Sequence, residues 1–160
     1  MIRVGLGVDI HPLKPGRPLI LGGVAIPFDQ GLDGHSDADV LIHAVCDALL
    51  GAAGRKDLGS HFPDSDPANR GAASTVFLER IMNRLTRDGW QVDNLDAVII
   101  AQAPRLAPYL ESMQKKVADY LGVELSSVSI KAKSPEGIGA LGSGDGIAAQ
   151  AVVLLEKRVP

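Results

Sequence analysis

The sequence has 160 residues, of which 46% are hydrophobic and 22% charged, which is typical of a globular chain and predicts a single domain over residues 1–160. Sixteen basic and nineteen acidic side chains give a net charge of −3, which argues against a nucleic-acid partner, and the single cysteine excludes an internal disulfide. Because no apolar run could span a bilayer and the N-terminus lacks the order of a signal peptide, we expect a cytoplasmic chain without a membrane partner.

Short apolar runs bounded by glycine or proline predict the strands. In chain order these runs are residues 4–10, a bent pair within 18–26, then 95–101, 128–133 and 147–155. The last run is also compatible with a helix. The run 95–101 is apolar almost throughout, which favours a mixed sheet covered by helices on one side.

Apolar residues that recur every three to four positions predict helices over residues 36–50, 73–87 and 108–121. In the first of these helices, Ser36 and Asp39 resemble an N-terminal capping box. Two long connections, residues 54–71 and the glycine-rich residues 137–146, complete the chain.

Polar side chains gather in the first third of the sequence. Asp9 and His11 are two residues apart in a strand and therefore share one face. In the following helix, Asp39, His43 and Asp47 lie together on the polar side. Two histidines and one carboxylate form the open three-ligand set of catalytic zinc, although a solvent-exposed polar face gives the same pattern.

Two side-chain roles near His43 remain open at this point. Cys46 could compete as a soft metal ligand, or it is a small, half-buried apolar residue. Asp39 or Asp47 could hold the second nitrogen of His43.

Two later segments also carry candidate binding groups. The connection 54–71 contains Asp57, Asp64 and Asp66, which could accept sugar hydroxyls or could simply form turns. Small residues follow the strand 95–101, where ligands of α/β proteins often bind. Lys131 and Lys133 share one strand face before Ser134 and Glu136, and this group could grip a polyphosphate or form a charged strand end.

Six motifs in this order resemble the 2-C-methyl-D-erythritol 2,4-cyclodiphosphate synthase family. The resemblance extends from Arg3 to about Leu155, and six motifs at matching separations are specific where each alone is weak. The motifs are Gly7-Val8-Asp9-Ile10-His11; Gly34-His35-Ser36-Asp37-Ala38-Asp39 followed by His43; Asp47-Ala48-Leu49-Leu50-Gly51-Ala52; Phe62-Pro63-Asp64-Ser65-Asp66-Pro67; Ala101-Gln102-Ala103-Pro104; and Gly144-Asp145-Gly146-Ile147-Ala148.

The resemblance implies an α+β fold that assembles as a homotrimer, with active sites at subunit interfaces. It implies a phosphorus–oxygen lyase that converts 4-diphosphocytidyl-2-C-methyl-D-erythritol 2-phosphate to the 2,4-cyclodiphosphate and CMP in non-mevalonate isoprenoid biosynthesis. Asp9, His11 and His43 match the zinc ligands, and Glu136 matches the residue that holds Mg²⁺ or Mn²⁺ on the diphosphate. His35 and Ser134 match residues that stabilise the transition state.

The resemblance also implies two groups of substrate contacts. The first surrounds the methylerythritol part and consists of Asp57, Gly59, Phe62, Asp64 and Asp66. Asp9, His11, His35 and Ser36 are implied as further substrate contacts. The second forms the cytidine pocket and consists of Ala101, Gln102, Ala103, Pro104, Arg105, Leu106, Ala107, Ala132 and Lys133, and Ser134 is implied as a further substrate contact.

The chain departs from the family pattern after Ser134. Pro135 and Lys133 stand where threonine or another polar residue is common in the family, which alters the expected hold on the diphosphate. Ala140 and Ser143 replace an aromatic residue and an arginine, so we expect weak binding of an isoprenoid diphosphate in the central cavity of the trimer.

Two other functions fit the same residues. A zinc phosphoesterase would use water in place of the internal nucleophile, and a trimeric nucleotide-binding protein would use zinc only structurally. A closed structural zinc site usually has four ligands rich in cysteine, and this chain has one cysteine.

Overall fold

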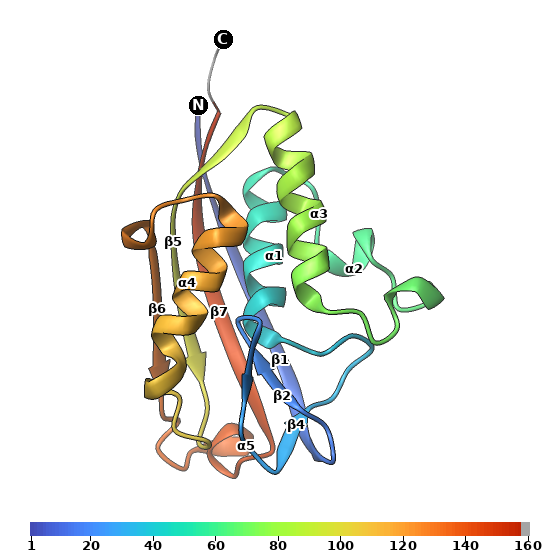
Figure 1. Ribbon diagram of the computed structural model, residues 1–160, viewed down its shortest axis with the longest axis vertical. Coiled ribbons are helices and arrows are strands. Elements are labelled where there is room, and N and C mark those ends of the chain that lie inside the picture. Colours follow the sequence, from blue (N-terminus) through green and yellow to red (C-terminus); the bar gives the residue numbers. More distant parts are fainter. Residues whose placement is uncertain (158–160) are drawn as a thin grey trace.

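A computed structural model describes residues 1–157, which fold around one five-stranded sheet. Across the sheet the strands follow the order β4-β1-β7-β5-β6 (Figure 1). The pair β5–β6 is parallel and the other neighbours are antiparallel, so the sheet is mixed, as predicted. The strands are β1 (Ile2–Pro15), β4 (Gln30–Leu32), β5 (Trp90–Ile100), β6 (Val128–Lys133) and β7 (Gly146–Lys157).

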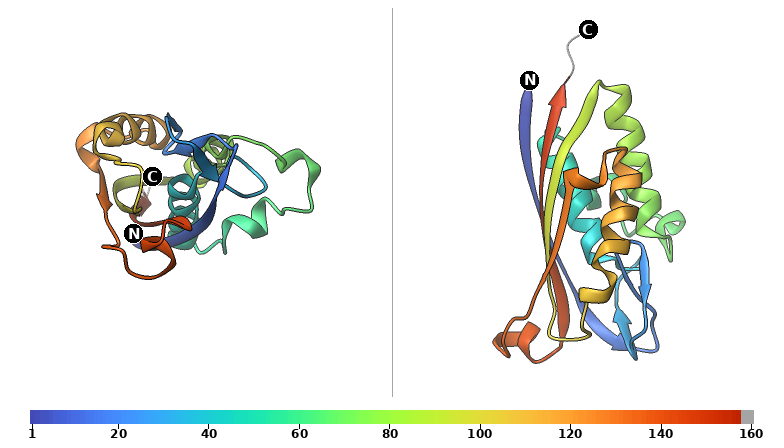
Figure 2. Two further views of the ribbon diagram at one scale, coloured as in Figure 1. Left: turned by 90° about the horizontal axis from the view of Figure 1, so that it is seen from below. Right: turned by 60° about the vertical axis from the view of Figure 1, so that its left-hand side comes forward.

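The long helices cover one face of this sheet and leave the other face bare (Figure 2, right). A separate hairpin, β2 (Leu19–Leu21) with β3 (Val24–Ile26), packs beside them and confirms the bent pair of strands. The α+β class and the helices over one side are therefore confirmed. The helices are α1 (Val40–Ala52), α2 (Leu58–His61), α3 (Ser74–Arg87), α4 (Leu110–Leu121) and α5 (Gly139–Gly142), with short 3₁₀ turns η1 (Pro67–Asn69), η2 (Ala107–Tyr109) and η3 (Leu125–Ser127).

The elements differ from the sequence-based expectation at several points. Strands β1 and β5 are longer than the predicted runs 4–10 and 95–101, and β4 was not predicted. The first helix begins at Val40 and not at Ser36, because the Asp39 carboxylate caps it by accepting the backbone N–H of Ile42. The connection 54–71 contains α2 and η1, and the glycine-rich loop contains α5. Residues 147–155 are strand, because they pair with β1 on one side and with β5 on the other.

Helix α1 lies directly against the backbone of β1. A Cβ atom at Gly5 would stand 1.9 Å from the carbonyl oxygen of Ala48, and one at Gly7 would stand 1.9 Å from that of Ala44. Only glycine fits at these two strand positions. Since alternate strand residues share a face, Asp9 and His11 continue the same inward row toward the N-terminal end of α1.

The opposite row of β1 is apolar and exposed. Its side chains are 57–65% exposed, and Val152 of β7 joins them beside Leu6. The exposed β1 residues are Ile2, Val4, Leu6, Val8 and Ile10. This surface is the bare face of the sheet, and one described chain leaves it open to solvent.

No helix within residues 1–157 is long and apolar enough to cross a membrane.

We predict that Gly7→Ala lowers the free energy of unfolding by about 3 kcal/mol, the upper end of the range for an overpacked core, because the added methyl meets helix backbone. Denaturant titration followed by circular dichroism measures the change. The matched control is Gly51→Ala in α1, whose Cβ would meet no closer atom than the Leu6 oxygen at 3.8 Å. The control should be neutral or up to about 1 kcal/mol more stable, owing to helix propensity. Equal losses in both variants would refute the close-packing account.

Candidate active site

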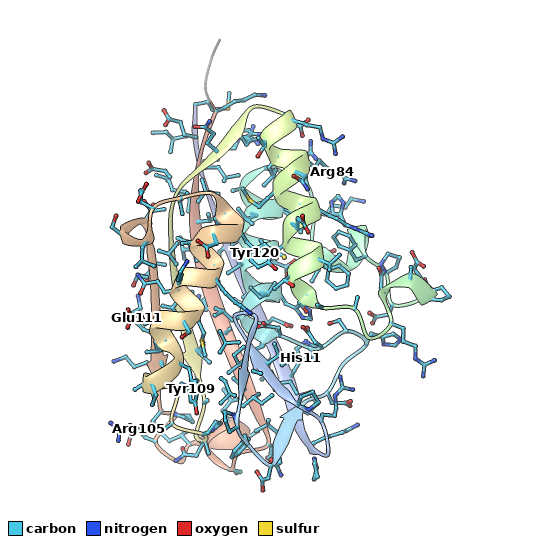
Figure 3. All side chains as sticks on the ribbon, viewed as in Figure 1. His11, Arg84, Arg105, Tyr109, Glu111 and Tyr120 are labelled. Carbon is cyan, nitrogen blue, oxygen red and sulfur yellow. The ribbon has the colours of Figure 1, made fainter. Side chains whose placement is uncertain are left out.

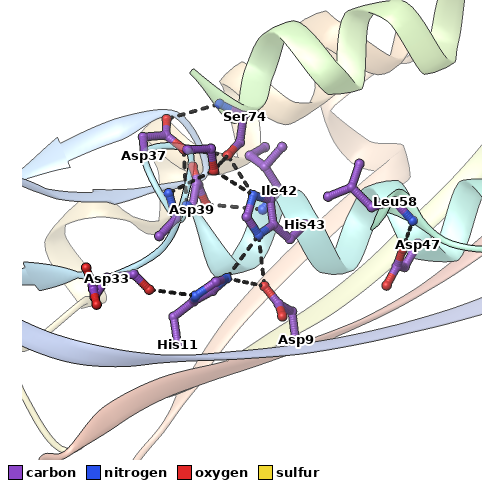
Figure 4. Close-up of polar contacts among 12 residues, drawn as sticks. Asp9, His11, Asp33, Asp37, Asp39, Ile42, His43, Asp47, Leu58 and Ser74 are labelled. Carbon is purple, nitrogen blue, oxygen red and sulfur yellow. Dashed lines mark hydrogen bonds and ion pairs between the residues drawn. The ribbon is translucent and has the colours of Figure 1, made fainter. Parts of the chain in front are cut away.

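Three ligand atoms from β1 and α1 converge on one point (Figure 4). Asp9 Oδ2 lies 2.9 Å from His11 Nε2 and 3.0 Å from His43 Nδ1, and the two ring nitrogens are 3.1 Å apart. All three side chains are partly buried, and among the described residues this is the group of side chains that could hold a metal ion. One carboxylate and two imidazoles on one side of a point fit a divalent ion with an open coordination position.

The site favours positive charge. Burial by itself would raise the pKa of Asp9, but hydrogen bonds with His11 and His43 outweigh it and hold that pKa well below its usual range. Hydrogen bonding to Asp9 raises the pKa of His11 against the opposing effect of burial. Both shifts have one cause: a carboxylate shared by two imidazoles stabilises a proton or a metal ion beside it.

The backbone fixes how His11 faces this point. Its Nδ1–H donates to the carbonyl oxygen of Asp33 at 2.9 Å, since a carbonyl can only accept. The lone pair of Nε2 is thereby turned toward Asp9 and His43.

Asp39 contributes to the site only through the backbone, contrary to the polar-face prediction. Its wholly buried carboxylate accepts N–H groups of Gly22 at 2.9 Å, Gly23 at 2.7 Å and Ile42 at 3.1 Å. Burial raises the pKa of Asp39 to about 6, although these N–H groups act in the opposite direction. Asp39 therefore ties the start of α1 to the β2–β3 turn.

The second nitrogen of His43 is held by serines, and the expectation of Asp39 or Asp47 was wrong. His43 Nε2 lies 2.8 Å from the Ser74 hydroxyl and 3.2 Å from that of Ser36. The Ser74 hydroxyl in turn donates to the Asp37 carboxylate. Asp47 accepts the Leu58 N–H at 2.7 Å instead, which anchors α2.

Cys46 plays no part in this cluster. Its side chain is wholly buried in the hydrophobic core, and burial raises the pKa of the thiol well above its ordinary value. The alternative in which Cys46 competes for the metal is therefore wrong. Cys46 is an apolar core residue, although it is wholly buried and not half-buried as expected.

The cluster lies in the wall of a cavity of about 430 Å³ that the α2 segment completes. Asp57 caps α2 by accepting the Ser60 N–H at 2.8 Å, and the Phe62 ring packs 4.7 Å from that of Phe77 on α3. His35 Nδ1 lies 3.8 Å from the Asp64 carboxylate across the cavity mouth. Besides the three ligands, the predicted residues that line this cavity are His35, Ser36, Asp57, Gly59, Phe62 and Asp64.

The other predicted residues lie elsewhere. Asp66 lines a second pocket behind the α2 segment. The segments 101–107 and 132–136 follow β5 and β6, and they do not line the cavity of this chain. Strand β5 is two neighbours from β1, a separation of about 10 Å. In Figure 3, Arg105 accordingly lies at the lower left of the view, apart from His11 near its middle.

These later segments are nonetheless tied to each other. The Ala101 N–H donates to the Lys133 carbonyl at 3.1 Å, and the Gly137 N–H donates to Gln102 Oε1 at 3.1 Å. Glu136 has a positive φ of 55° and donates its N–H to the Ser134 hydroxyl at 2.9 Å. These contacts fix the backbone on both sides of the Glu136 Cα.

Sequence reasoning missed Ser74, Asn69 and Phe77. Ser74 is the first residue of α3, where a serine is ordinarily explained as part of a helix start. Asn69 and Phe77 line the cavity from η1 and α3, and an apolar helix position gives no sign that it borders a cavity. Asp37, which accepts the Ser74 hydroxyl, was also missed as a site residue. It lies in the motif of residues 34–39 beside His35, and this position was the one signal in the sequence that could have identified it.

Known proteins match this chain along nearly its whole length. The YgbB family model matches residues 2–156. The 2-C-methyl-D-erythritol 2,4-cyclodiphosphate synthase of Desulfatibacillum aliphaticivorans is 54% identical over 155 residues, covering 97% of this chain and 100% of that protein. The protein of the same name from Pelotomaculum thermopropionicum is 55% identical over 156 residues, covering 98% of this chain and 96% of the relative.

Solved structures share the fold. The bifunctional IspDF from Campylobacter jejuni matches with a TM-score of 0.94 at 35% identity, over 99% of this chain and 43% of that one. The CDP complex of IspF from Plasmodium falciparum matches with a TM-score of 0.87 at 31% identity, over 99% of this chain and 97% of that one. The matched length, the identity and the shared fold together show that this chain belongs to the YgbB family, whose relatives here are 2-C-methyl-D-erythritol 2,4-cyclodiphosphate synthases.

Proposed function

We propose that this chain is a metal-dependent cyclase that converts 4-diphosphocytidyl-2-C-methyl-D-erythritol 2-phosphate to 2-C-methyl-D-erythritol 2,4-cyclodiphosphate and CMP. The observation that carries the proposal is the convergence of Asp9, His11 and His43 in the wall of a carboxylate-lined cavity. The relative solved as a CDP complex supports a nucleotide substrate. The product belongs to non-mevalonate isoprenoid precursor synthesis, and we infer that this chain carries out the reaction in the cytoplasm.

The donor set supports zinc at Asp9, His11 and His43, because imidazole and carboxylate with an open position suit catalytic zinc. Glu136 would hold a second divalent ion, Mg²⁺ or Mn²⁺, together with the substrate phosphates. When bound, such ions supply positive charge opposite the diphosphate.

The residues around the ligands set the ring orientations that metal binding needs. With Nδ1 of His43 facing the ligand point, its Nε2 carries the proton and donates to Ser74, which donates to Asp37. This line of hydrogen bonds fixes the tautomer and makes the ring a better donor to a metal. Ser74 is thus a positioning residue.

The reaction needs alignment more than proton transfer. An oxygen of the 2-phosphate attacks the β-phosphorus, the bond to the CMP oxygen breaks, and the attacking phosphate is already ionised at neutral pH. Asp57 and Asp64 would accept the hydroxyl groups of the methylerythritol chain. His35 would donate a hydrogen bond to the charge that develops, and Ser134 would do so from the cytidine side.

The cytidine part would bind the segments that follow β5 and β6. Small residues at Ala101, Ala103 and Ala132 leave room for a flat ring beside the backbone. The Gln102 contact with Gly137 joins this segment to the loop of Glu136, so base and diphosphate would be gripped by one connected unit.

We infer that the complete site forms between chains of a homotrimer. Cyclic assembly brings two different surfaces of neighbouring copies together. The separation of the metal cluster from the cytidine segments within one chain supports this arrangement. The bare apolar face of β1 supports burial against other copies. Ala140 and Ser143, exposed on and after α5, lack the aromatic and arginine groups that would clamp an isoprenoid diphosphate in a central channel.

We predict that the purified chain releases CMP and the cyclic diphosphate from the diphosphocytidyl substrate, and that a chelator abolishes the reaction. Phosphorus NMR distinguishes this product from the ring-opened product of a phosphoesterase, and absence of turnover would favour a nucleotide-binding protein.

Glu136→Gln should lower turnover at least a hundredfold while zinc content stays unchanged, because zinc is held by other residues. Loss of zinc in this variant would contradict the two-site assignment.

We predict that Ser74→Ala weakens zinc affinity by roughly tenfold, since partners of ligating histidines typically contribute that much. Competition titration against a chromophoric chelator measures it. Cys46→Ala is the matched control, a buried substitution on α1 outside the cluster, and its zinc affinity should equal that of the wild type. His43→Ala should bind no zinc. A wild-type affinity in Ser74→Ala would remove Ser74 from the positioning role.

We predict that mixed trimers of two inactive variants regain activity. Asp9→Ala inactivates the metal side of a site and Glu136→Gln inactivates the cytidine side. If each site takes these two sides from different chains, refolding an equal mixture should restore about one site in four, because each side is intact in half of the chains. Unmixed variants refolded in the same way are the controls. Verified mixed trimers that stay inactive would show that each site lies within one chain.

A further inference from the structure

A second pocket, of about 380 Å³, lies behind the active-site cavity. It is bounded by the C-terminal end of α1, the segment from α2 to η1, and one face of α3. Four arginines line it: Arg55, Arg80, Arg84 and Arg87. Figure 3 shows Arg84 on α3, well apart from His11.

Three of the four arginines in this pocket have no ion pair among the described residues. Arg80, Arg84 and Arg87 are four and three residues apart and therefore share one face of α3. Arg55 pairs with Asp88, whereas the ion pairs found within residues 1–157 include none for the three arginines of α3. Asp66 is the one carboxylate among the lining residues. In a chain of net charge −3, such a concentration of positive charge is a local feature.

The end of the helix accounts for part of the arrangement only. Arg84 and Arg87 lie in the last turn of α3, where cations interact favourably with the helix dipole. Arg80 is one turn earlier, and Arg55 comes from the connection after α1. The dipole therefore does not explain why four arginines line one pocket.

His61 orients one of these guanidinium groups. Its Nε2–H donates to the carbonyl oxygen of Arg55 at 2.8 Å, so its Nδ1 has a lone pair that accepts from Arg84 Nη1 at 3.0 Å. Arg84 donates one of its five N–H groups to this contact, and the other four can donate to a ligand. A guanidinium set in place beforehand loses less freedom when it binds an oxyanion.

We propose that this pocket binds a small phosphorylated metabolite, whose phosphate group is held by Arg80, Arg84 and Arg87. Guanidinium forks match phosphate oxygens in bidentate pairs, which favours a phosphate over a monovalent anion. The apolar side chains of Leu50, Ile81 and Leu85 line the rest of the pocket and suit a short carbon skeleton. The site is distinct from that of the proposed reaction, because the metal ligands do not line it.

The two cavities share a wall. Phe62 and Asn69 line both of them, and Asn69 holds the segment by donating to the Pro63 carbonyl at 3.0 Å. A ligand in the arginine pocket would therefore rest against the same segment that closes the active-site cavity.

The test is isothermal titration of the metal-loaded protein with glycerol 3-phosphate, with inorganic phosphate as a second probe that lacks the carbon skeleton. We expect one molecule per chain, and tighter binding of glycerol 3-phosphate than of inorganic phosphate. The double variant Arg80→Gln, Arg84→Gln keeps a similar helix propensity and should bind at least about tenfold more weakly, because charge-assisted hydrogen bonds are lost. Arg70→Gln is the control. Arg70 is an exposed arginine shortly before α3 that does not line the pocket, so its loss should leave the affinity unchanged.

His43→Ala separates the two sites, because it removes the proposed metal centre and leaves the arginines in place. Retained binding in His43→Ala, or in chelator-treated wild type if that variant does not fold, supports the arginine pocket. Binding that is lost in His43→Ala or after chelation, but kept in the Arg80→Gln, Arg84→Gln variant, would assign the phosphate to the metal centre. That result would overturn the proposal. An equal loss in Arg70→Gln, or no binding at millimolar probe, would overturn it as well. None of these readouts depends on cyclase activity.

Discussion

The contact between the backbones of α1 and β1 is the constraint on which the rest of the structure depends. Gly5 and Gly7 let the helix approach until its carbonyl oxygens fill the space of two side chains. Asp9 and His11 then follow on the same strand face, just where the first turn of α1 presents His43. A shift of one residue in the register of β1 would turn both ligands to the opposite face of the sheet. The same packing that forms the core thus sets the geometry of the metal cluster.

The sequence pattern predicted those features of the site that depend only on neighbouring residues, namely the faces of a strand or a helix on which side chains lie. Strand alternation placed Asp9 and His11 on one face, and the apolar period of α1 placed His43 away from the core, because neither depends on distant residues. The role of Asp39 could not be obtained in this way, since its burial results from the β2–β3 turn that approaches from 16 residues earlier. Ser74 reaches His43 only because α3 packs on α1, across 31 residues of sequence. The separation of Ala101–Ala107 from the metal cluster follows from the order of the strands in the sheet. Local sequence pattern does not predict that order.

The bare face of the sheet gives the molecule two unlike sides. Helices α1, α3 and α4 bury the inner side of the sheet, whereas the outer row of β1 is as apolar as a core strand and remains exposed. Toward β6 that outer side becomes polar, and Lys131 pairs with Asp96 across the β5–β6 edge. An apolar strip beside a charged strip supports association in one orientation, because the apolar part supplies the driving force and the charges restrict the register.

The hydrogen-bonded line from His43 through Ser74 to Asp37 has a thermodynamic consequence. Ser74 is the first residue of α3, and its backbone N–H also donates to Asp37 at 3.1 Å, so the start of α3 and the ring of His43 are fixed by one carboxylate. An ion that binds the folded ring and not the unfolded chain adds to stability by mass action, by about 2.7 kcal/mol at a free concentration one hundred times its dissociation constant. An ion held by Asp9, His11 and His43 would therefore also stabilise the packing of α3 on α1, because the same hydrogen-bonded line joins the His43 ring to the first residue of α3.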